Sequence, residues 1–264
     1  CGKMGTSLMR GWVHANTGTI DIVDPNPLPH DLYSTITHYA VDLESLPSAT
    51  SPYDAIVLAV KPTQINDVCA DISARPDLYG PHTIILSIAA GQTVSSIQSI
   101  LPPTATVIRA MPNLPASVLR GITALYTHSH TSTSARDMGQ RLCSAVGDVI
   151  WVDDETLMDA VTALSGSGPA YLFLLIEEMA RAGVQLGLPP DTAMILARQT
   201  VIGASELARQ SPDISAELLR NNVTSPGGTT EAALKILMND QNGMTDLFTR
   251  ALTAARDRSR ELQQ

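Results

Sequence analysis

AIVLAVKP, residues 55–62, is the stretch that decides the fold class of this chain. Ala55–Val60 is a continuous apolar run rather than an alternating one, which is typical of a strand covered on both faces of a sheet. Further runs of this kind are Thr19–Val23, Thr83–Ile88, Thr106–Arg109 and Gly121–Tyr126. Helical stretches such as Gln64–Ala74 and Ser95–Leu101 separate several of them. Alternation of strands and helices predicts an α/β fold with a parallel, doubly wound sheet.

The sequence changes character near Trp151. From Val152 to Gln264 it shows helical periodicity and almost no strand signal. The expected helices are Asp153–Leu164, Pro169–Leu186, Asp191–Gln210, Thr230–Met238 and Met244–Leu262. We therefore expect an α/β domain over residues 1–152 and an all-helical domain over residues 153–264.

The helix that begins at Pro169 is apolar on nearly every side through Ile176. Such a helix has to be buried on several sides, which a small helical domain cannot achieve alone. We therefore expect this domain to pack against a second subunit. Asp191, which follows Pro189 and Pro190, is expected to cap the next helix.

Composition excludes several classes of protein. The net charge is −9, with 26 acidic against 17 basic residues and no basic run, which argues against a nucleic-acid partner. The three cysteines are far apart, and His128 and His130 have no carboxylate or cysteine at ligand spacing. These features predict no metal site and a reducing, cytoplasmic compartment. The apolar runs are too short to span a bilayer and no signal peptide is visible, so no membrane partner is expected.

CGKMG, residues 1–5, carries part of a dinucleotide-binding fingerprint. Gly2 and Gly5 have the spacing of the second and third glycines in G-x-G-x-x-G, where the backbone approaches a pyrophosphate at the start of a helix. With Lys3 and Met4 between them, they form the first candidate cofactor site of a Rossmann-type domain. The first glycine of the fingerprint and the strand that carries it would precede this segment.

Asp24 ends the next predicted strand, 19 residues after Gly5. An acidic residue at this distance can bind the ribose 2′-hydroxyl and repel a 2′-phosphate, which would favour NADH over NADPH. A turn residue before Pro25 is the alternative, and both roles stay open.

Two other strand ends carry small residues where open α/β sheets bind their ligands. The candidate cofactor contacts there are Ala59, Val60, Lys61, Ala89, Ala90 and Gly91. Small side chains let a flat cofactor approach the backbone, and Lys61 could contact a phosphate or a ribose. Simple turn chemistry is the alternative at each site taken alone.

RAMPN, residues 109–113, follows another short strand. Met111 could pack against a nicotinamide ring, although methionine more often fills a core. Asn113 could orient the ring or hold the crossing of the chain. Both residues are included among the candidate cofactor contacts.

SGSGPAY, residues 165–171, interrupts the helical half. Pro169 suits the first position of a helix, whereas Gly166 and Gly168 leave the backbone bare. This pattern suggests backbone brought close to a small ligand or a facing subunit, with Ser167 as a candidate substrate contact.

NNVTSPGGTTEAALKIL, residues 221–237, places a cluster of hydroxyl residues and glycines directly before a strong helix. The first amides of that helix lack partners and carry a partial positive charge. They could therefore hold a carboxylate, as helix starts hold phosphate. The candidate substrate contacts are Ser225, Gly227, Gly228, Thr229 and Thr230. The alternative is an unusually polar helix cap.

Taken together, CGKMG, AVKP, SIAAG, RAMPN, SGSGPAY and NVTSPGGTT resemble the pyrroline-5-carboxylate reductase family in order and spacing over essentially the whole chain. The last two motifs are the most specific. The resemblance implies a dinucleotide-binding domain followed by a helical domain that intertwines into dimers, often assembled further into decamers. It also implies reduction of 1-pyrroline-5-carboxylate to L-proline, the last step of proline synthesis, with NADPH or NADH.

By this resemblance, Ser225, Thr229 and Thr230 with Gly228 contact the carboxylate and ring nitrogen of the substrate. The cofactor contacts that the resemblance implies are Ala59, Lys61 and Ala90. The family usually has an acidic residue where this chain has Asn221, which would alter the electrostatics of the site.

The chemistry of such a reaction agrees with what the sequence lacks. It has no Ser–His–Asp set, and its three lysines are Lys3, Lys61 and Lys235. Hydride addition to a protonated C=N bond needs neither a nucleophile nor a metal. We expect the hydroxyl of Thr230 to be the catalytic group, through a hydrogen bond to the ring nitrogen.

Two alternatives remain at this point. A reductase of the β-hydroxyacid dehydrogenase type would rely on a lysine in the helical half, where only Lys235 is available, inside a helix. A non-catalytic dinucleotide sensor would need the glycine turn but not the hydroxyl cluster before Thr230.

Overall fold

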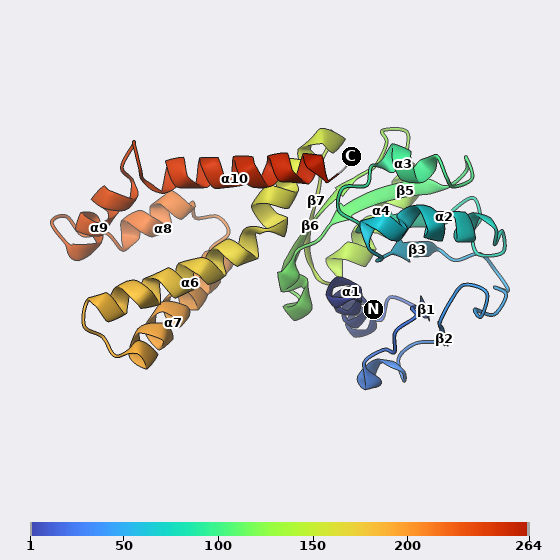
Figure 1. The fold of residues 1–264 in the computed structure, drawn as a ribbon, viewed down its shortest axis with the longest axis horizontal. Coiled ribbons are helices and arrows are strands. Elements are labelled where there is room, and N and C mark those ends of the chain that lie inside the picture. The colour runs from blue at the N-terminus through green and yellow to red at the C-terminus, as the bar shows by residue number, and fades with distance from the viewer. Residues whose placement is uncertain (1, 263–264) are drawn as a thin grey trace. The chain divides into compact units, whose positions relative to one another are not determined.

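The computed structural model of this protein describes residues 2–262; Cys1, which opens the glycine-rich segment, and residues 263–264 lie outside the described residues. The chain forms two compact units (Figure 1). Unit 1 is Cys1–Gly166 together with Ala255–Gln264, and unit 2 is Ser167–Ala254. The predicted domains, residues 1–152 and 153–264, are functional domains rather than compact units, and their boundary stays a prediction.

The centre of unit 1 is a five-stranded sheet. Its strands, in spatial order, are β3 (Ala55–Leu58), β4 (Ile84–Ser87), β5 (Thr106–Met111), β6 (Gly121–Tyr126) and β7 (Gly147–Trp151). A separate parallel pair is formed by β1 (Asp21–Val23) and β2 (His38–Ala40). Each of the five strands expected from the sequence is present, whereas β2 and β7 were not predicted. The sequence of β2 is only three residues long, and β7 begins with a glycine, so neither has a strong apolar run.

One pairing in the sheet differs from the prediction of a parallel sheet. The pairs β3–β4, β4–β5 and β6–β7 are parallel, but β5 and β6 are antiparallel. Only residues 112–120 connect β5 to β6, and they hold a short 3₁₀ helix, Leu114–Val118. A parallel connection needs a crossover of a dozen or more residues, so the chain turns back instead.

Helices cover both faces of this sheet (Figure 1). On one face, Ile85 and Val107 pack with α2 (Ile65–Ser73) and α3 (Val94–Gln98). On the other face, the helices are α1 (Lys3–Ala15) and α4 (Thr133–Ser144). The strand residues that pack with α4 are Ile84, Leu86, Ile108, Ala110 and Leu125. Successive side chains alternate between the faces, and both faces are buried, which explains the continuous apolar runs and confirms the doubly wound α/β class.

The last part of unit 1 is helical and irregular. A 3₁₀ turn (Glu155–Leu157) leads into α5 (Met158–Val161) and then into a π-helical turn (Thr162–Gly166). The carboxyl end of α10 (Met244–Glu261) also belongs to unit 1. There Ser259 donates a hydrogen bond of 2.8 Å to the buried carboxylate of Asp159 on α5, which fastens the end of the chain to this unit.

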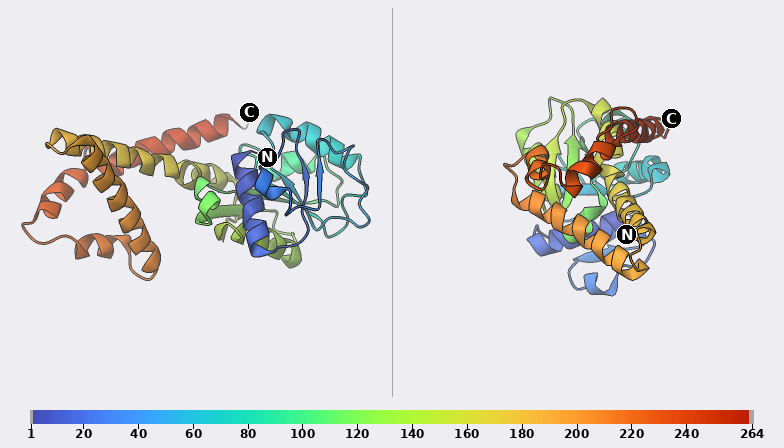
Figure 2. Two further views of the ribbon diagram at one scale, coloured as in Figure 1. Left: turned by 90° about the horizontal axis from the view of Figure 1, so that it is seen from below. Right: turned by 90° about the vertical axis from the view of Figure 1, so that its left-hand side faces the viewer.

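Unit 2 is helical. Its complete helices are α6 (Gly168–Gln185), α7 (Pro190–Gln210), α8 (Ala216–Asn222) and α9 (Thr229–Leu237). Figure 2 shows α6 and α7 joined by a tight turn and diverging away from it. Gly187 occupies the left-handed region in that turn, with φ of 98°, and Ala180, Ala193 and Ala197 let the two helices approach closely. The prediction that Asp191 caps α7 was wrong: Pro190 is the first residue of the helix, as its fixed φ favours, and Asp191 lies in the first turn.

Many apolar side chains of unit 2 are exposed in the single chain. On α6 these are Leu172, Phe173, Leu174, Leu175 and Met179. By length and mean hydropathy alone, the helical stretch Glu155–Gln185 would be able to cross a bilayer, and 17% of its most apolar window is buried. This stretch is longer than any apolar run in the sequence because the structure joins residues 155–166 to α6. A helix with this exposure needs a covering surface, as the sequence indicated for the segment after Pro169.

Candidate functional site

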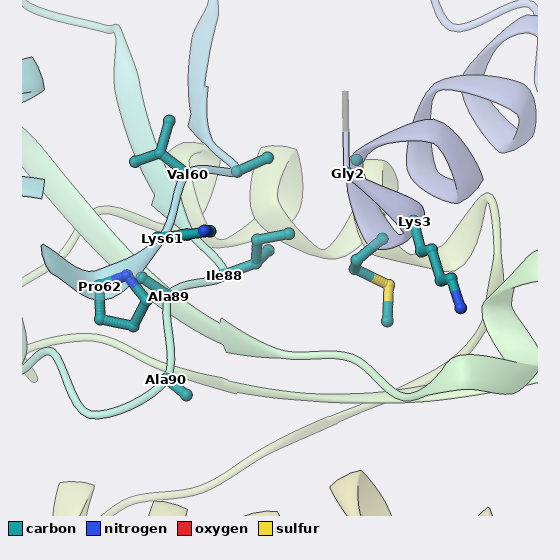
Figure 3. Close-up of a pocket in the computed structure, with 11 residues that line it drawn as sticks. Gly2, Lys3, Val60, Lys61, Pro62, Ile88, Ala89 and Ala90 are labelled. Carbon is teal, nitrogen blue, oxygen red and sulfur yellow. The ribbon is translucent and has the colours of Figure 1, made fainter. Parts of the chain in front are cut away.

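A pocket of about 290 Å³ lies in unit 1, where the glycine-rich segment meets two strand ends (Figure 3). The residues that line it are Gly2, Lys3, Met4, Gly5, Ala59, Val60, Lys61, Pro62, Ile88, Ala89 and Ala90. Figure 3 shows Lys61, Ala89 and Ala90 on one side of the pocket and Gly2 and Lys3 on the other. Three separate motifs of the sequence therefore meet around one cavity.

The strand ends create one wall of this pocket. β3 ends at Leu58 and β4 ends at Ser87, and the two strands are parallel neighbours, so their carboxyl ends lie at the same edge of the sheet. Pro62 ends the first segment by starting a 3₁₀ helix. Gly91 closes the second turn with φ of 76°, a conformation that favours glycine. The alanines that follow each strand leave the backbone accessible from the cavity.

The start of α1 creates the opposite wall. Gly2 is the N-cap of this helix and has no side chain to satisfy the first amides, while the buried Gly5 packs inward. A Cβ on Gly2 would meet no atom within 4 Å, so packing within the described chain does not require a glycine there. An unblocked helix start beside two lysines is suited to an anionic diphosphate. The residues present therefore fit a dinucleotide cofactor.

Four residues predicted as cofactor contacts do not line this pocket: Asp24, Gly91, Met111 and Asn113. The carboxylate of Asp24 accepts hydrogen bonds from the backbone amide of Asn26 at 2.8 Å and from its side chain at 3.2 Å. Partial burial raises the pKa of Asp24, whereas the hydrogen bonds from Asn26 lower it. Asp24 thus has the turn contacts that the sequence offered as its alternative role.

The two predicted residues of the RAMPN segment have structural contacts. Met111 is buried in a cluster with Ala124 and Met158. Oδ1 of Asn113 accepts from the amide of Ile122 at 2.9 Å, across the reversal between β5 and β6. Asn113 therefore holds the crossing of the chain, one of the two roles expected for it.

The hydroxyl-rich segment before α9 lies in unit 2, as does Ser167, which directly precedes α6. Helix α9 begins at Thr229, and Gly228 is its N-cap without a side-chain hydrogen bond. Gly227 takes the left-handed conformation, with φ of 71°, and the amide of Gly228 donates to the carbonyl oxygen of Ser225 at 3.0 Å. Glycine is thus favoured at 227 by the backbone conformation, and at 228 because a Cβ there would lie 3.0 Å from the carbonyl oxygen of Ser225.

Sequence reasoning missed the carboxylate that already lies at this helix start. The amide of Gly227 donates to Oε2 of Glu231 over 2.7 Å. Glu231 is the third residue of α9, the position from which a capping-box glutamate reaches back to the amides before a helix. The same carboxylate lies 3.7 Å from Nζ of Lys235. The spacing of Glu231 from the N-cap could have revealed this contact. Pro62 and Ile88, which also line the unit 1 pocket, were not among the predicted contacts.

No group of three or more His, Cys, Asp or Glu side chains suited to a metal ion occurs among residues 2–262. The thiols of Cys69 and Cys143 are both buried and unpaired with each other, and burial raises the pKa of each. Neither cysteine therefore has the exposed, activated character of a nucleophile.

Comparison with known proteins covers both parts of the chain. Residues 155–262 match the family model described as pyrroline-5-carboxylate reductase dimerisation, and residues 1–91 match the one described as NADP oxidoreductase, coenzyme F420-dependent. A pyrroline-5-carboxylate reductase of Pseudomonas aeruginosa is 40% identical over 99% of this chain and 94% of its own length. One of Haemophilus influenzae is 38% identical over 80% of this chain and 76% of its own length.

Solved structures agree with these relatives. The structure of a pyrroline-5-carboxylate reductase from Coxiella burnetii matches with a TM-score of 0.87 and 35% identity, covering 100% of this chain and 96% of that one. The Plasmodium falciparum enzyme, solved with NADP bound, matches with a TM-score of 0.79 and 26% identity, covering 100% and 95%. With a full-length relative at 40% identity, this chain belongs to the pyrroline-5-carboxylate reductase family.

Proposed function

We propose that this reductase holds its cofactor in the unit 1 pocket and the carboxylate of its substrate at the start of α9. As a member of the family, the protein reduces 1-pyrroline-5-carboxylate to L-proline with NAD(P)H. The single observation that carries the cofactor assignment is the meeting of the glycine turn with the ends of β3 and β4 around one pocket. When bound, the nicotinamide cofactor supplies the hydride.

The proposed cofactor contacts are the pocket residues of those three segments. Lys3 and Lys61 supply positive charge for the phosphates, and the start of α1 supplies amide donors. Ala59, Ala89 and Ala90 leave room for the cofactor beside the backbone. Gly91 contributes through the shape of its turn rather than by lining the cavity.

The substrate carboxylate is proposed to bind the amides and hydroxyls at the start of α9. Support comes from Glu231, whose own carboxylate already accepts a hydrogen bond from Gly227 there. The hydroxyl of Thr230 is then available to hold the ring nitrogen as it becomes an amine, with Ser225 and Thr229 beside the carboxylate. Ser167 is proposed to close one side of the site.

The choice between NADH and NADPH depends on Asp24 in this proposal. An aspartate carboxylate is charged at neutral pH and would repel a 2′-phosphate. This favours NADH. Its contacts with Asn26 support the competing role of a turn residue.

The helical part, residues 153–264, is proposed to bind substrate and to form a homodimer, with assembly into decamers as a further possibility. The exposed apolar side chains of α6 and the match of residues 155–262 to a dimerisation family support the dimer rather than a membrane. The buried free thiols of Cys69 and Cys143 support a reducing, cytoplasmic location.

The alternatives have less support. A β-hydroxyacid dehydrogenase would need a catalytic lysine in the helical half, but Lys235 lies in an exposed ion pair with Glu231. A dinucleotide sensor would not need the turn before α9.

A steady-state assay tests the proposed function. Imine-dependent oxidation of NADH and NADPH is measured alongside small hydroxyacids with the oxidised cofactors, together with cofactor binding in the absence of substrate. We expect turnover with the cyclic imine only. Turnover of a hydroxyacid would favour the dehydrogenase, and cofactor binding with no turnover would favour the sensor.

A further inference from the structure

Glu155 joins three segments of unit 1 that are far apart in the sequence. Its Oε1 accepts a hydrogen bond from the amide of Val94, 61 residues earlier, over 2.8 Å. The same oxygen accepts from Nη1 of Arg109 over 3.2 Å. Glu155 is only 18% exposed at its side chain and Arg109 only 1%, so both contacts are shielded from solvent.

The contact with Val94 lies next to the segment that lines the proposed cofactor pocket. Val94 is fully buried and is the first residue of α3, so its amide has no partner within the helix. The turn of residues 88–91 carries Ile88, Ala89 and Ala90, which line the pocket, and residues 92–93 join this turn to the helix. β4 holds the turn at one end, and the bond from Val94 to Glu155 holds it at the other.

The contact with Arg109 explains why a carboxylate can be kept there. In the described part of the chain, Nε and Nη2 of Arg109 are buried without a hydrogen-bond partner, so Glu155 is the counter-ion for this guanidinium. Removing one partner of a buried ion pair is strongly destabilising, whereas replacing both by apolar residues is often neutral. Charge balance and loop positioning can therefore be separated by mutation.

We propose that Glu155 is a positioning residue for the nicotinamide cofactor, which fixes the start of α3 and with it the pocket turn of residues 88–91. This inference rests on the proposed cofactor pocket. Glu155 does not line the pocket itself and acts through Val94. The acceptor oxygen does the positioning, and the charge serves Arg109.

Three variants separate these roles. Glu155→Gln keeps an acceptor oxygen for Val94 but loses the charge. The double variant Arg109→Met with Glu155→Met loses the acceptor and leaves no buried charge behind. Asp154→Asn is the matched control, because Asp154 is the neighbouring carboxylate and bonds only to Thr156 in the contacts that the structure describes.

The experiment measures the Kd of NADH and NADPH by calorimetry, the melting temperature, and kcat and KM for both substrates. In the double variant, we expect the Kd of the cofactor to rise about tenfold, because one hydrogen bond to a charged group is lost. The kcat at saturating cofactor and the KM for the imine should stay nearly unchanged. Glu155→Gln should melt at a lower temperature and bind cofactor within about twofold of wild type. Asp154→Asn should match wild type in cofactor binding.

A double variant that is folded and binds both cofactors like wild type would overturn the inference alone. A lower kcat with unchanged cofactor Kd would also overturn it, since that result indicates a purely structural role. A wild type that binds neither cofactor would overturn the proposed pocket, and the inference with it.

Discussion

The side-chain amide of Asn113 donates a hydrogen bond of 3.2 Å to the carbonyl oxygen of Ser165, 52 residues further along the chain. Asn113 belongs to the RAMPN segment, and Ser165 belongs to the π-helical turn that opens SGSGPAY. A Cβ on Gly166 would lie 3.8 Å from the sulfur of Met111, so the two segments are also in van der Waals reach. The RAMPN segment and the first two residues of SGSGPAY are thus in direct contact within unit 1, and π-helical turns are frequent at functional sites.

Substitution of Asn113 by leucine should destabilise unit 1. The amide of Ile122 and the carbonyl of Ser165 both lose a partner, so we expect a loss of about 2–4 kcal/mol in the free energy of unfolding. Urea denaturation measures this loss. Asn239→Ala, which removes exposed turn contacts to the amides of Gln241 and Asn242, is the control and should cost less than about 1 kcal/mol. Equal effects of the two variants would contradict the bridging role.

Thr230→Ala should lower kcat/KM for the imine by about 10–100-fold, because the hydrogen bond that we propose Thr230 makes to the reacting nitrogen is lost. Steady-state kinetics at saturating cofactor measure the effect. Thr249→Ala is the control, since its hydroxyl bonds only to the carbonyl of Thr245 within α10 in the described contacts. Near wild-type turnover in Thr230→Ala would remove Thr230 from the mechanism.

Glu231→Gln should lower KM for the imine by about 2–5-fold. The carboxylate of Glu231 accepts from Gly227 where the substrate carboxylate is proposed to bind, so its negative charge opposes that anion. KM at several salt concentrations measures the effect, which should shrink as salt screens the charges. Glu217→Gln, in the first turn of α8, is the control. An increase in KM would indicate that Glu231 supports the site instead.

Asp24→Ser should shift the ratio of kcat/KM for NADPH over NADH upward by about tenfold, because the carboxylate that we propose repels a 2′-phosphate is removed. Serine can still hold the turn before Asn26 through its hydroxyl. Asp31→Asn, which removes a carboxylate paired with Arg10, controls for the change in net charge. An unchanged ratio would leave Asp24 as a turn residue only.

Asp77 should make unit 1 sensitive to acid. The hydrogen bonds from Arg75 lower the pKa of Asp77 well below its ordinary value of 3.8, and the bond from the amide of Ala49 adds to this. A lowered pKa in the folded state stabilises the fold above pH 3.8, and this contribution is lost as the pH falls from there toward the folded pKa.

Asp77→Asn should therefore melt a few degrees below wild type at pH 7, and the difference should narrow as the pH falls below about 4. Melting curves at several pH values measure it. Asp67→Asn removes a charge from α2 but no ion pair seen among residues 2–262, so it should follow wild type. A constant difference from pH 7 to pH 2 would show that Asp77 acts by packing alone.

Much of the fold followed from the sequence because burial leaves a local trace. Strands covered on both faces need unbroken apolar runs, and β3 to β6 all have them. The short β2 and the glycine-initiated β7 carry no such run. Each is a strand because it pairs with another strand, β2 with β1 and β7 with β6. The reversal at β6 was missed for a similar reason: it depends on the length of the connection after Met111, not on the composition of the strand.

The candidate sites divide in the same way. The sequence by itself determined which backbone positions are bare or small, namely the glycine turn, the alanines after β3 and β4, and the turn before α9. Only the tertiary structure decided which partners meet: three of those segments around one pocket, Asn113 with Ser165, and Glu155 with Val94. Local composition reports what a residue can do alone. Hydrogen bonds between distant residues depend on register and loop length, which are properties of the whole folded chain.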